Sequence, residues 1–474
     1  MSDTLKKDNH SKTLFKNVDD SLRLNKEFNE FRERSSSLPA RWMADHVYQL
    51  FKDPEGNFLE QFQTNGFSPR LFELYLFAYF YYEDFHVDRD HVNPDFLVSR
   101  NGLTVAVEAT TINPSTSGVL SISGKEISDL SDKEFEYYRN HELPIRFGSP
   151  LFSKLKKKYW ELEHCKGLPF VIAIEAFYDE GSLAFSESAL ASYLYGLDEK
   201  LSWDNEGNPH VQRIQIDYHQ VDKKRIQSNF FSQPDAINIS AIVFTNSGTF
   251  AKFARMGYQY GIGANNVYII RTGHKYNSNA LSFDPTLFSF SMDNAPFIES
   301  WGDDLVVLHN PKCLHSIPRG YFPDAVDLYL ENGILAASVP GWHTISSKTL
   351  IMHLDEKLIK LKKTLPFSKN RWSISAISAQ EFREISGTPS PPEILGQEHG
   401  WFCDDAGGFF GVILQDHIDS DWGYAILARG ENFAFHAIDL SFGFVSRDRA
   451  IIALHFKLLE RLLSPKRIFV QDEV

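Results

Sequence analysis

Two short runs in which apolar and polar residues alternate lie on either side of Asn101-Gly102, over residues 94–100 and 103–110. Asn-Gly between such runs is a strong signal for a β-hairpin with a two-residue type I′ turn. The turn fixes the strand register by counting outward. The resulting pairs are Arg100 with Leu103, Ser99 with Thr104, Val98 with Val105, Leu97 with Ala106, Phe96 with Val107, and Asp95 with Glu108.

The predicted register brings two carboxylates face to face. Because successive side chains point to opposite faces of a strand, Asp95, Glu108 and Thr110 share one face of the hairpin. Apolar side chains line the other face: Phe96, Val98, Val105, Val107 and Ala109. Like charges directly opposite each other on a sheet are destabilising, so the pair calls for a compensating cation.

The remaining hydrophobic pattern alternates helices with apolar strands. A helix is expected over about 41–51, and Ser68-Pro69 and Ser149-Pro150 each open a further one, because Ser is a favoured N-cap and Pro a favoured first helical residue. The continuous apolar run 170–176 is typical of a buried, parallel strand. Later segments continue the series, with a helix at 186–195, a strand or hairpin near 211–218, strands at 238–245 and 267–271, and a helix at 248–257 between those two strands.

This order predicts three parts of the chain. Residues 1–38 are polar and form a flexible N-terminal arm or a weak amphipathic helix, and residues 39–275 form a mixed α/β domain. Residues 276–474 form a C-terminal α+β domain, with strands at 409–415, 422–428 and 433–438 and a helix from 446 to about 463.

Composition and charge narrow the class of protein. The chain has 474 residues, 43% of them hydrophobic, and a formal charge of −14, so any nucleic-acid binding must depend on a local basic patch. The odd number of cysteines, 3, without zinc-site spacing, favours a reducing compartment. No apolar run approaches the ~20 residues that a membrane span needs. We therefore expect a cytoplasmic protein without a membrane partner.

A third acidic residue stands out in the helix that follows Ser68-Pro69. Glu73 is the only charged residue between Leu71 and Tyr82, where it either benefits from the helix dipole near the N-terminus or joins Asp95 and Glu108 in a site. Nearby, the segment 85–91 carries His86, Asp88, Asp90 and His91. A polar edge strand explains that segment most simply, with a supporting role beside Asp95 as the alternative.

The helix with Glu73, then Pro94-Asp95 at the start of a strand, then a hairpin returning through Glu108-Ala109-Thr110, resembles the PD-(D/E)XK nuclease superfamily. The resemblance covers roughly residues 65–180. It implies a restriction-endonuclease-like mixed sheet flanked by helices, with Glu73, Asp95 and Glu108 binding Mg²⁺, for which Mn²⁺ can substitute. The family's lysine, which helps to activate the attacking water, is replaced by Thr110.

Related families supply that lysine from the neighbouring helix. Here that helix is predicted from Ser149 to about Cys165, and its segment 149–160 carries four lysines. At 3.6 residues per turn its buried stripe is Leu151, Leu155, Tyr159 and Leu162, and Lys157 points away from it. Lys154 and Lys158 lie on the shoulder of the stripe, where a long side chain can reach an adjacent cleft. Lys154 is the first candidate and Lys158 the second, while a solvated or phosphate-contacting face for all four remains open.

The leading hypothesis is a Mg²⁺-dependent endonuclease that hydrolyses phosphodiester bonds in DNA or, less favoured, RNA, as restriction and anti-phage defence effectors do. The C-terminal domain would recognise substrate, a protein partner or a second copy. Two alternatives stay open. One is a catalytically inactive module of the same fold that binds nucleic acid or protein, because the lysine is missing at Thr110. The other is a metal-dependent hydrolase with a different substrate.

Overall fold

The computed structural model describes residues 12–16, 23–112, 131–176, 187–203, 209–277, 285–356, 359, 374–377, 401–404, 409–415, 421–429, 435–444 and six helical residues between 450 and 458. These residues form two compact units. The first comprises Met1–Arg34, Ala40–Met256 and Glu299–Ser346, and the second comprises Ser35–Pro39, Gly257–Ile298 and Ser347–Val474.

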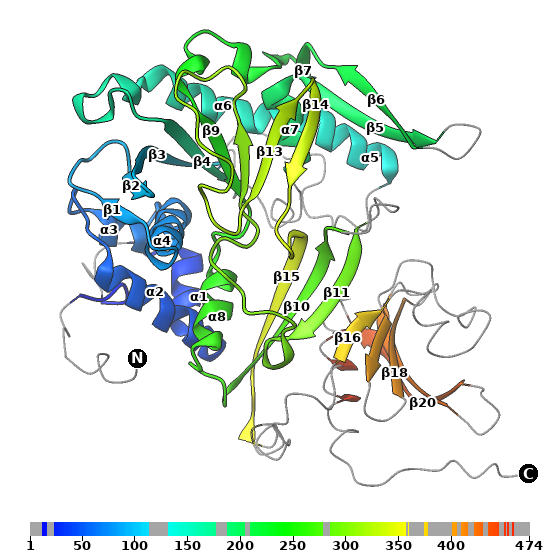
Figure 1. The fold of residues 1–474 in the computed structure, drawn as a ribbon. Helices are drawn as coiled ribbons and strands as arrows, with labels where there is room; N and C mark the ends of the chain where they lie inside the picture. The colour runs from blue at the N-terminus through cyan, green and yellow to red at the C-terminus, as the bar shows by residue number, and fades with distance from the viewer. Residues whose placement is uncertain are drawn as a thin grey trace, which may run out of the picture. The chain divides into compact units, whose positions relative to one another are not determined.

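The first unit is built on an eight-stranded mixed sheet with the strand order β1-β2-β3-β4-β9-β12-β13-β14, of which all but β12 are labelled in Figure 1. Strands β3, β4 and β9 are mutually parallel, β12 is parallel to β13, and the other neighbours are antiparallel. The predicted mixed α/β class is therefore confirmed. The strands are β1 (His86–Asp88), β2 (Phe96–Arg100), β3 (Leu103–Ile112), β4 (Phe170–Ala176), β9 (Ala241–Thr245), β12 (Val306–His309), β13 (Val326–Glu331) and β14 (Ile334–Ser338).

Two sets of helices cover the two faces of this sheet (Figure 1). Leu97 and Ala106 belong to the hydrophobic cluster that also contains residues of α6 and α7. Phe96 is next to Leu97 on β2, so its side chain points to the opposite face of the sheet. There it packs against Phe80 of α4, with ring centroids 5.4 Å apart. The helices of the first unit are α1 (Lys26–Glu33), α2 (Leu38–Leu50), α3 (Phe58–Gln63), α4 (Phe67–Tyr82), α5 (Asp132–Tyr137), α6 (Leu143–Lys157), α7 (Ser188–Tyr195) and most of α8 (Phe250–Gln259).

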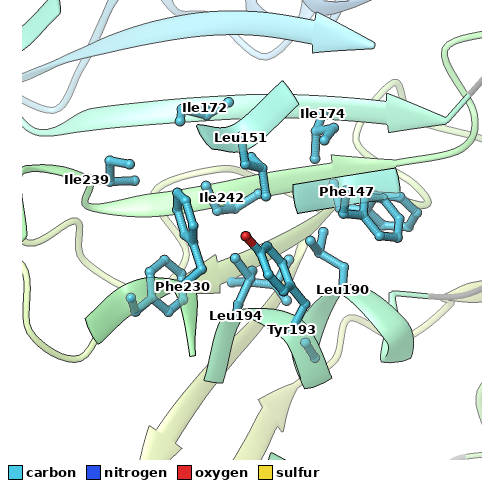
Figure 2. Close-up of a cluster of buried hydrophobic side chains, with 14 of the residues drawn as sticks. Phe147, Leu151, Ile172, Ile174, Leu190, Tyr193, Leu194, Phe230, Ile239 and Ile242 are labelled. Carbon is cyan, nitrogen blue, oxygen red and sulfur yellow. The ribbon is translucent and has the colours of Figure 1, made fainter. Parts of the chain in front are cut away.

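The core on the α6 and α7 side of the sheet is almost wholly aliphatic and aromatic. Figure 2 shows Ile172 and Ile174 of β4 and Ile242 of β9 facing Leu151 of α6 and Leu190 of α7. All five side chains are fully buried, and burying such a side chain contributes about 1.5–3 kcal/mol. This core fixes α6 firmly against β3 and β4.

Helix α4 is buried on nearly all sides, which explains its almost continuous apolar sequence. Its Tyr75 hydroxyl donates to the carbonyl oxygen of Trp301 at 2.9 Å, and its Tyr79 hydroxyl donates to that of Pro323 at 3.0 Å. These bonds tie the segment Glu299–Ser346 to the first unit.

The division of the chain differs from the predicted boundary near residue 275. Glu299–Ser346 returns to the first unit because β12 pairs with β9 and brings β13 and β14 into the same sheet. Within the predicted arm, 1–38, residues Lys26–Glu33 form helix α1, which agrees with the helical alternative for this segment. Asn25 caps α1 by accepting hydrogen bonds from the backbone of Glu27 and Phe28, and Phe28 and Phe31 are buried.

The second unit contains most of a three-stranded sheet, and it contains a five-stranded antiparallel sheet. The strands are β10 (Val267–Lys275), β11 (Thr286–Ser291), β15 (Thr344–His353), β16 (Ile374–Ile377), β17 (Trp401–Asp404), β18 (Phe409–Gln415), β19 (Trp422–Arg429) and β20 (Phe435–Phe444). Helical residues around Leu454 pack on Ile413 and Ile426 of the larger sheet. Strands and helix follow the α+β pattern expected for the C-terminal residues.

Two hairpins complete the first unit, β5 (Leu197–Trp203) with β6 (Pro209–Gln215) and β7 (Tyr218–Val221) with β8 (Lys224–Gln227). Among all the described residues, none of the helices has the length and apolar character to cross a lipid bilayer.

Candidate functional site

The hairpin at Asn101-Gly102 has the predicted register at each of its five strand pairs, from Arg100 opposite Leu103 to Phe96 opposite Val107. Asn101 has φ 52° and Gly102 has φ 78°, as a type I′ turn requires at both central residues. Asp95 immediately precedes β2, at the open end of the hairpin, and Glu108 lies on β3.

Asp95 and Glu108 are adjacent in space. The backbone N–H of Asp95 donates to Glu108 Oε2 at 3.3 Å, and the backbone N–H of Ala109 donates to Asp95 Oδ2 at 2.7 Å. Each acid is thus held by the backbone of the opposite strand. Glu108 is buried and Asp95 is partly buried, so the pair lies at the edge of the protein interior.

Lys154 of α6 completes the cluster. Its Nζ lies 2.5 Å from Glu108 Oε1, and the Lys154 and Glu108 side chains are 17% and 4% exposed. Helix α6 reaches the sheet as expected, through Leu151, Leu155 and the following Tyr159, all of which are buried.

The bounds of this helix differ from the prediction of 149–165. It begins at Leu143, with Pro144 in its first turn, and Pro150 lies inside it rather than at its start. It ends at Lys157, and short 3₁₀ turns follow at Tyr159–Glu161 and Glu163–Cys165.

Lys158, the second lysine candidate, does not reach the acids. It follows the last residue of α6 with φ 50°, and this left-handed conformation turns its side chain away from the line that continues the helix. Its Nζ pairs instead with Asp235 at 2.9 Å, where both side chains are over 40% exposed.

Glu73, the expected third ligand, has other partners. Its Oε2 accepts from Arg70 Nη1 and its Oε1 from Arg89 Nη2, both at 2.5 Å. Arg89 also lies over the aromatic rings of Phe51 and Phe96, at 4.0 and 4.6 Å from their centroids. Both oxygens of Glu73 are therefore engaged in a buried ion cluster, and the structure does not bring them to the Asp95–Glu108 pair as direct ligands.

The electrostatics of the pair favour a bound cation or a proton. Burial, followed by the nearby Glu108 and Glu73 carboxylates, raises the pKa of Asp95 well above its usual range, and Lys154 offsets this only in part. Burial and then Glu108 raise the pKa of Tyr159 to about 12. The same two causes raise the pKa of Cys165 to about 11. Two acids thus share one ammonium in a poorly hydrated place.

This donor set fits Mg²⁺. Mg²⁺ takes oxygen ligands, uses one or two carboxylates and keeps several of its own waters. In the described part of the chain, no group of three or more His, Cys, Asp or Glu side chains is placed to hold a metal ion. Asp95 and Glu108, with water as the other ligands, are the residues that would hold one.

Sequence reasoning missed three supports of the site. Arg70 and Arg89 neutralise Glu73, and only Arg70, three residues earlier on the same helix, could have been found from spacing. The third support is His164, whose Nε2 donates to the carbonyl oxygen of Asn93 at 2.8 Å. This bond links the end of the lysine-bearing segment to the loop that precedes Asp95.

The polar segment 85–91 contacts one of the residues that support the site, His164. His91 stacks on His164, with ring centroids 3.7 Å apart and an interplanar angle of 2°. Asp90 pairs with Lys52. Thr110, at the position of the missing lysine, is partly buried and lies beside Ile174 of β4.

Comparison of the chain with protein-family models, with curated proteins and with solved structures finds no match.

Proposed function

We propose that this chain is a Mg²⁺-dependent nuclease that hydrolyses phosphodiester bonds, with DNA favoured over RNA. The observation that carries the proposal is the meeting of Asp95, Glu108 and Lys154, which lie at a strand start, within a strand and on a helix. The contact of the two acids with a lysine from the helix supports the PD-(D/E)XK resemblance on which the proposal rests.

The fold supports the proposal in the same region. Helix α4 with Glu73, the β2–β3 hairpin with both acids, helix α6 with Lys154, and the parallel strand β4 follow one another in the chain. They pack as a mixed sheet with helices on both faces, and this mixed α/β arrangement supports the restriction-endonuclease-like core that we propose.

Each residue has a separate task in this proposal. Asp95 and Glu108 would hold the metal ion, which when bound would polarise the phosphate and lower the pKa of a bound water. Lys154 would bind a phosphate oxygen or orient the water, acting as the cation that Thr110 cannot supply. Glu73 would act without touching the metal, through its ion pairs with Arg70 and with Arg89, which packs on Phe96 of the hairpin.

The remaining parts of the proposal concern partners and context. The second unit would recognise the nucleic acid, a protein partner or a second copy of the chain. The protein would act in the cytoplasm, as restriction and anti-phage effectors do. Mn²⁺ would replace Mg²⁺, because it accepts the same oxygen ligands.

A non-catalytic binding module is the second candidate. The observation in its favour is that Glu108 and Glu73 are already neutralised by Lys154, Arg70 and Arg89, so the structure needs no metal for the charge balance of these two acids. Such a module would bind nucleic acid or protein without cleaving it.

The test is cleavage of plasmid DNA, single-stranded DNA and RNA, in Mg²⁺ or EDTA, by the wild type and by Asp95→Ala and Glu108→Ala. We expect metal-dependent cleavage that both substitutions abolish. Glu163→Ala is the matched control, because this acid follows α6 but is 88% exposed and pairs only with Lys166 in the described contacts. Cleavage that survives both substitutions would show that the site is misassigned, and binding without cleavage by the wild type would favour the second candidate.

A further inference from the structure

Both oxygens of Glu108 are engaged in the structure. Lys154 Nζ lies 2.5 Å from Oε1, and the backbone N–H of Asp95 donates to Oε2 at 3.3 Å. A Mg²⁺ ion bound to either oxygen would lie about 2.1 Å from it. The ammonium and the metal would then compete for the same carboxylate, since two cations so close together repel each other strongly in a poorly hydrated site.

We propose that the Lys154 ammonium occupies Glu108 until a divalent cation displaces it, so that metal binding and release of the lysine toward the substrate phosphate are one coupled event. This inference rests on the proposed function. It adds that Lys154 weakens metal binding, because its ammonium competes with the metal for Glu108. The ammonium is available to the substrate phosphate only when the metal is bound.

The structure indicates which partner moves. Glu108 lies on β3, between β2 and β4, and its neighbours on β3 are hydrogen-bonded to both of those strands. Lys154 lies in the last turn of α6, carries a flexible four-carbon stem and is 17% exposed. The lysine can therefore turn toward solvent by a rotamer change alone, whereas the Glu108 side chain is only 4% exposed and has little room to turn.

The exchange also follows from charge. Asp95 and Glu108 together carry two negative charges when ionised, and Lys154 supplies one positive charge. A divalent cation neutralises both acids and leaves the ammonium free to pair with a phosphate. The substrate then replaces the partner that Lys154 loses.

The first test is the affinity of Mn²⁺ and Mg²⁺ for the wild type, Lys154→Met and Lys156→Met, measured by calorimetry without nucleic acid. An effector commonly changes the affinity of a protein for a second ligand by about 5–150-fold, and here the ammonium takes the place of the effector. We expect Lys154→Met to bind the metal on the order of tenfold more tightly than the wild type, although it loses cleavage. Lys156→Met is the control, because its Nζ lies over the ring of Phe152 at 4.4 Å and should leave affinity unchanged.

The outcomes separate this inference from the proposed function. Equal or weaker metal binding by Lys154→Met, with binding by the wild type, overturns the competition and leaves the metal site intact. An absence of binding in both proteins overturns the metal site itself. Tighter binding in Lys154→Met that Asp95→Ala removes supports both.

The second test uses the wild type alone, so it does not depend on the folding of a variant. The full chain is briefly acetylated with an amine-reactive ester in EDTA or in saturating Mg²⁺, and the modified lysines are quantified by mass spectrometry. We expect acetylation of Lys154 to rise several-fold with Mg²⁺, while acetylation of the exposed Lys156 stays constant. If Mg²⁺ binds but the reactivity of Lys154 does not rise, the ammonium is not released and the inference fails.

Discussion

The role of Glu73 can be decided by replacing it with an isosteric neutral residue. Glu73→Gln keeps the shape and one acceptor oxygen but removes the charge that Arg70 and Arg89 share. The Glu73, Arg89 and Arg70 side chains are 5%, 6% and 15% exposed, so water screens the loss poorly. Breaking a buried ion pair by removing one partner costs about 3–5 kcal/mol, which is the loss of unfolding free energy that we expect.

The assay is urea denaturation followed by tryptophan fluorescence and by circular dichroism, because two probes reveal any separate unfolding of the two units. With a slope of about 3 kcal/mol/M, the expected loss lowers the midpoint of the transition of the first unit, which contains Glu73, by about 1–1.7 M. Glu55→Gln is the matched control. Glu55 also pairs with Arg70, at 3.1 Å, but it is 36% exposed, so its loss should cost less than about 1 kcal/mol.

Metal affinity provides the other half of the test. If Glu73 stabilises the fold through its arginines, Glu73→Gln should change the affinity for Mn²⁺ far less than Asp95→Asn does. A variant as stable as the wild type, with metal binding as weak as that of Asp95→Asn, would refute this reasoning and make Glu73 a direct ligand.

Three further predictions follow from single contacts. Lys158→Met should keep full cleavage and change the unfolding free energy by less than about 1 kcal/mol, measured by cleavage rate and urea midpoint, because the Lys158–Asp235 pair is exposed. Asp95→Asn should stabilise the metal-free protein at pH 7. The folded-state pKa of Asp95 is raised above its unfolded value, so the wild type loses stability as the pH rises from about 4 toward that pKa. The urea midpoints of the wild type and of Asp95→Asn should therefore differ at about pH 7 and converge at low pH. Gly248→Ala should lower the unfolding free energy by about 1–3 kcal/mol in the same assay, because a Cβ there would lie 2.2 Å from Glu175 Oε2.

The controls for these predictions differ in kind. For Gly248→Ala the control is Gly341→Ala, because a Cβ at Gly341 meets no described atom within 4 Å. For Asp95→Asn, a stability gain that is constant from pH 4 to pH 7 would contradict the raised pKa of Asp95. For Lys158→Met, loss of cleavage with unchanged metal binding would return this lysine to the site.

Sequence reasoning succeeded where structure is local. The Asn101-Gly102 turn sets the register of its two strands, and Asp95 and Glu108 follow from that register without any information about the rest of the fold. The contact between Lys154 and Glu108 was predictable for a similar reason, since the position of Lys154 relative to Leu151 and Leu155 is fixed within one helix.

It failed where partners are distant in sequence or a helix ends early. Lys158 is four residues from Lys154, but α6 ends between them, so the periodicity no longer applies. Arg89 reaches Glu73 across 16 residues and a change of element, which no spacing rule predicts. Strands β13 and β14 were missed although Asn332-Gly333 joins them with positive φ at both residues, the same turn signal that gave the first hairpin.

The return of Glu299–Ser346 to the first sheet has a consequence for how the chain can be shortened and how it folds during synthesis. A fragment that ends at residue 275 lacks β12, and it therefore leaves one side of β9 unpaired, although every residue of Ala241–Thr245 is buried in the full chain. Such a bare apolar edge is a template for aggregation. During synthesis on the ribosome the same edge stays unpaired until about 65 further residues have been added, from the end of β9 to Leu308. A fragment for expression should therefore extend through β14, and a chaperone has most reason to engage the nascent chain in that interval.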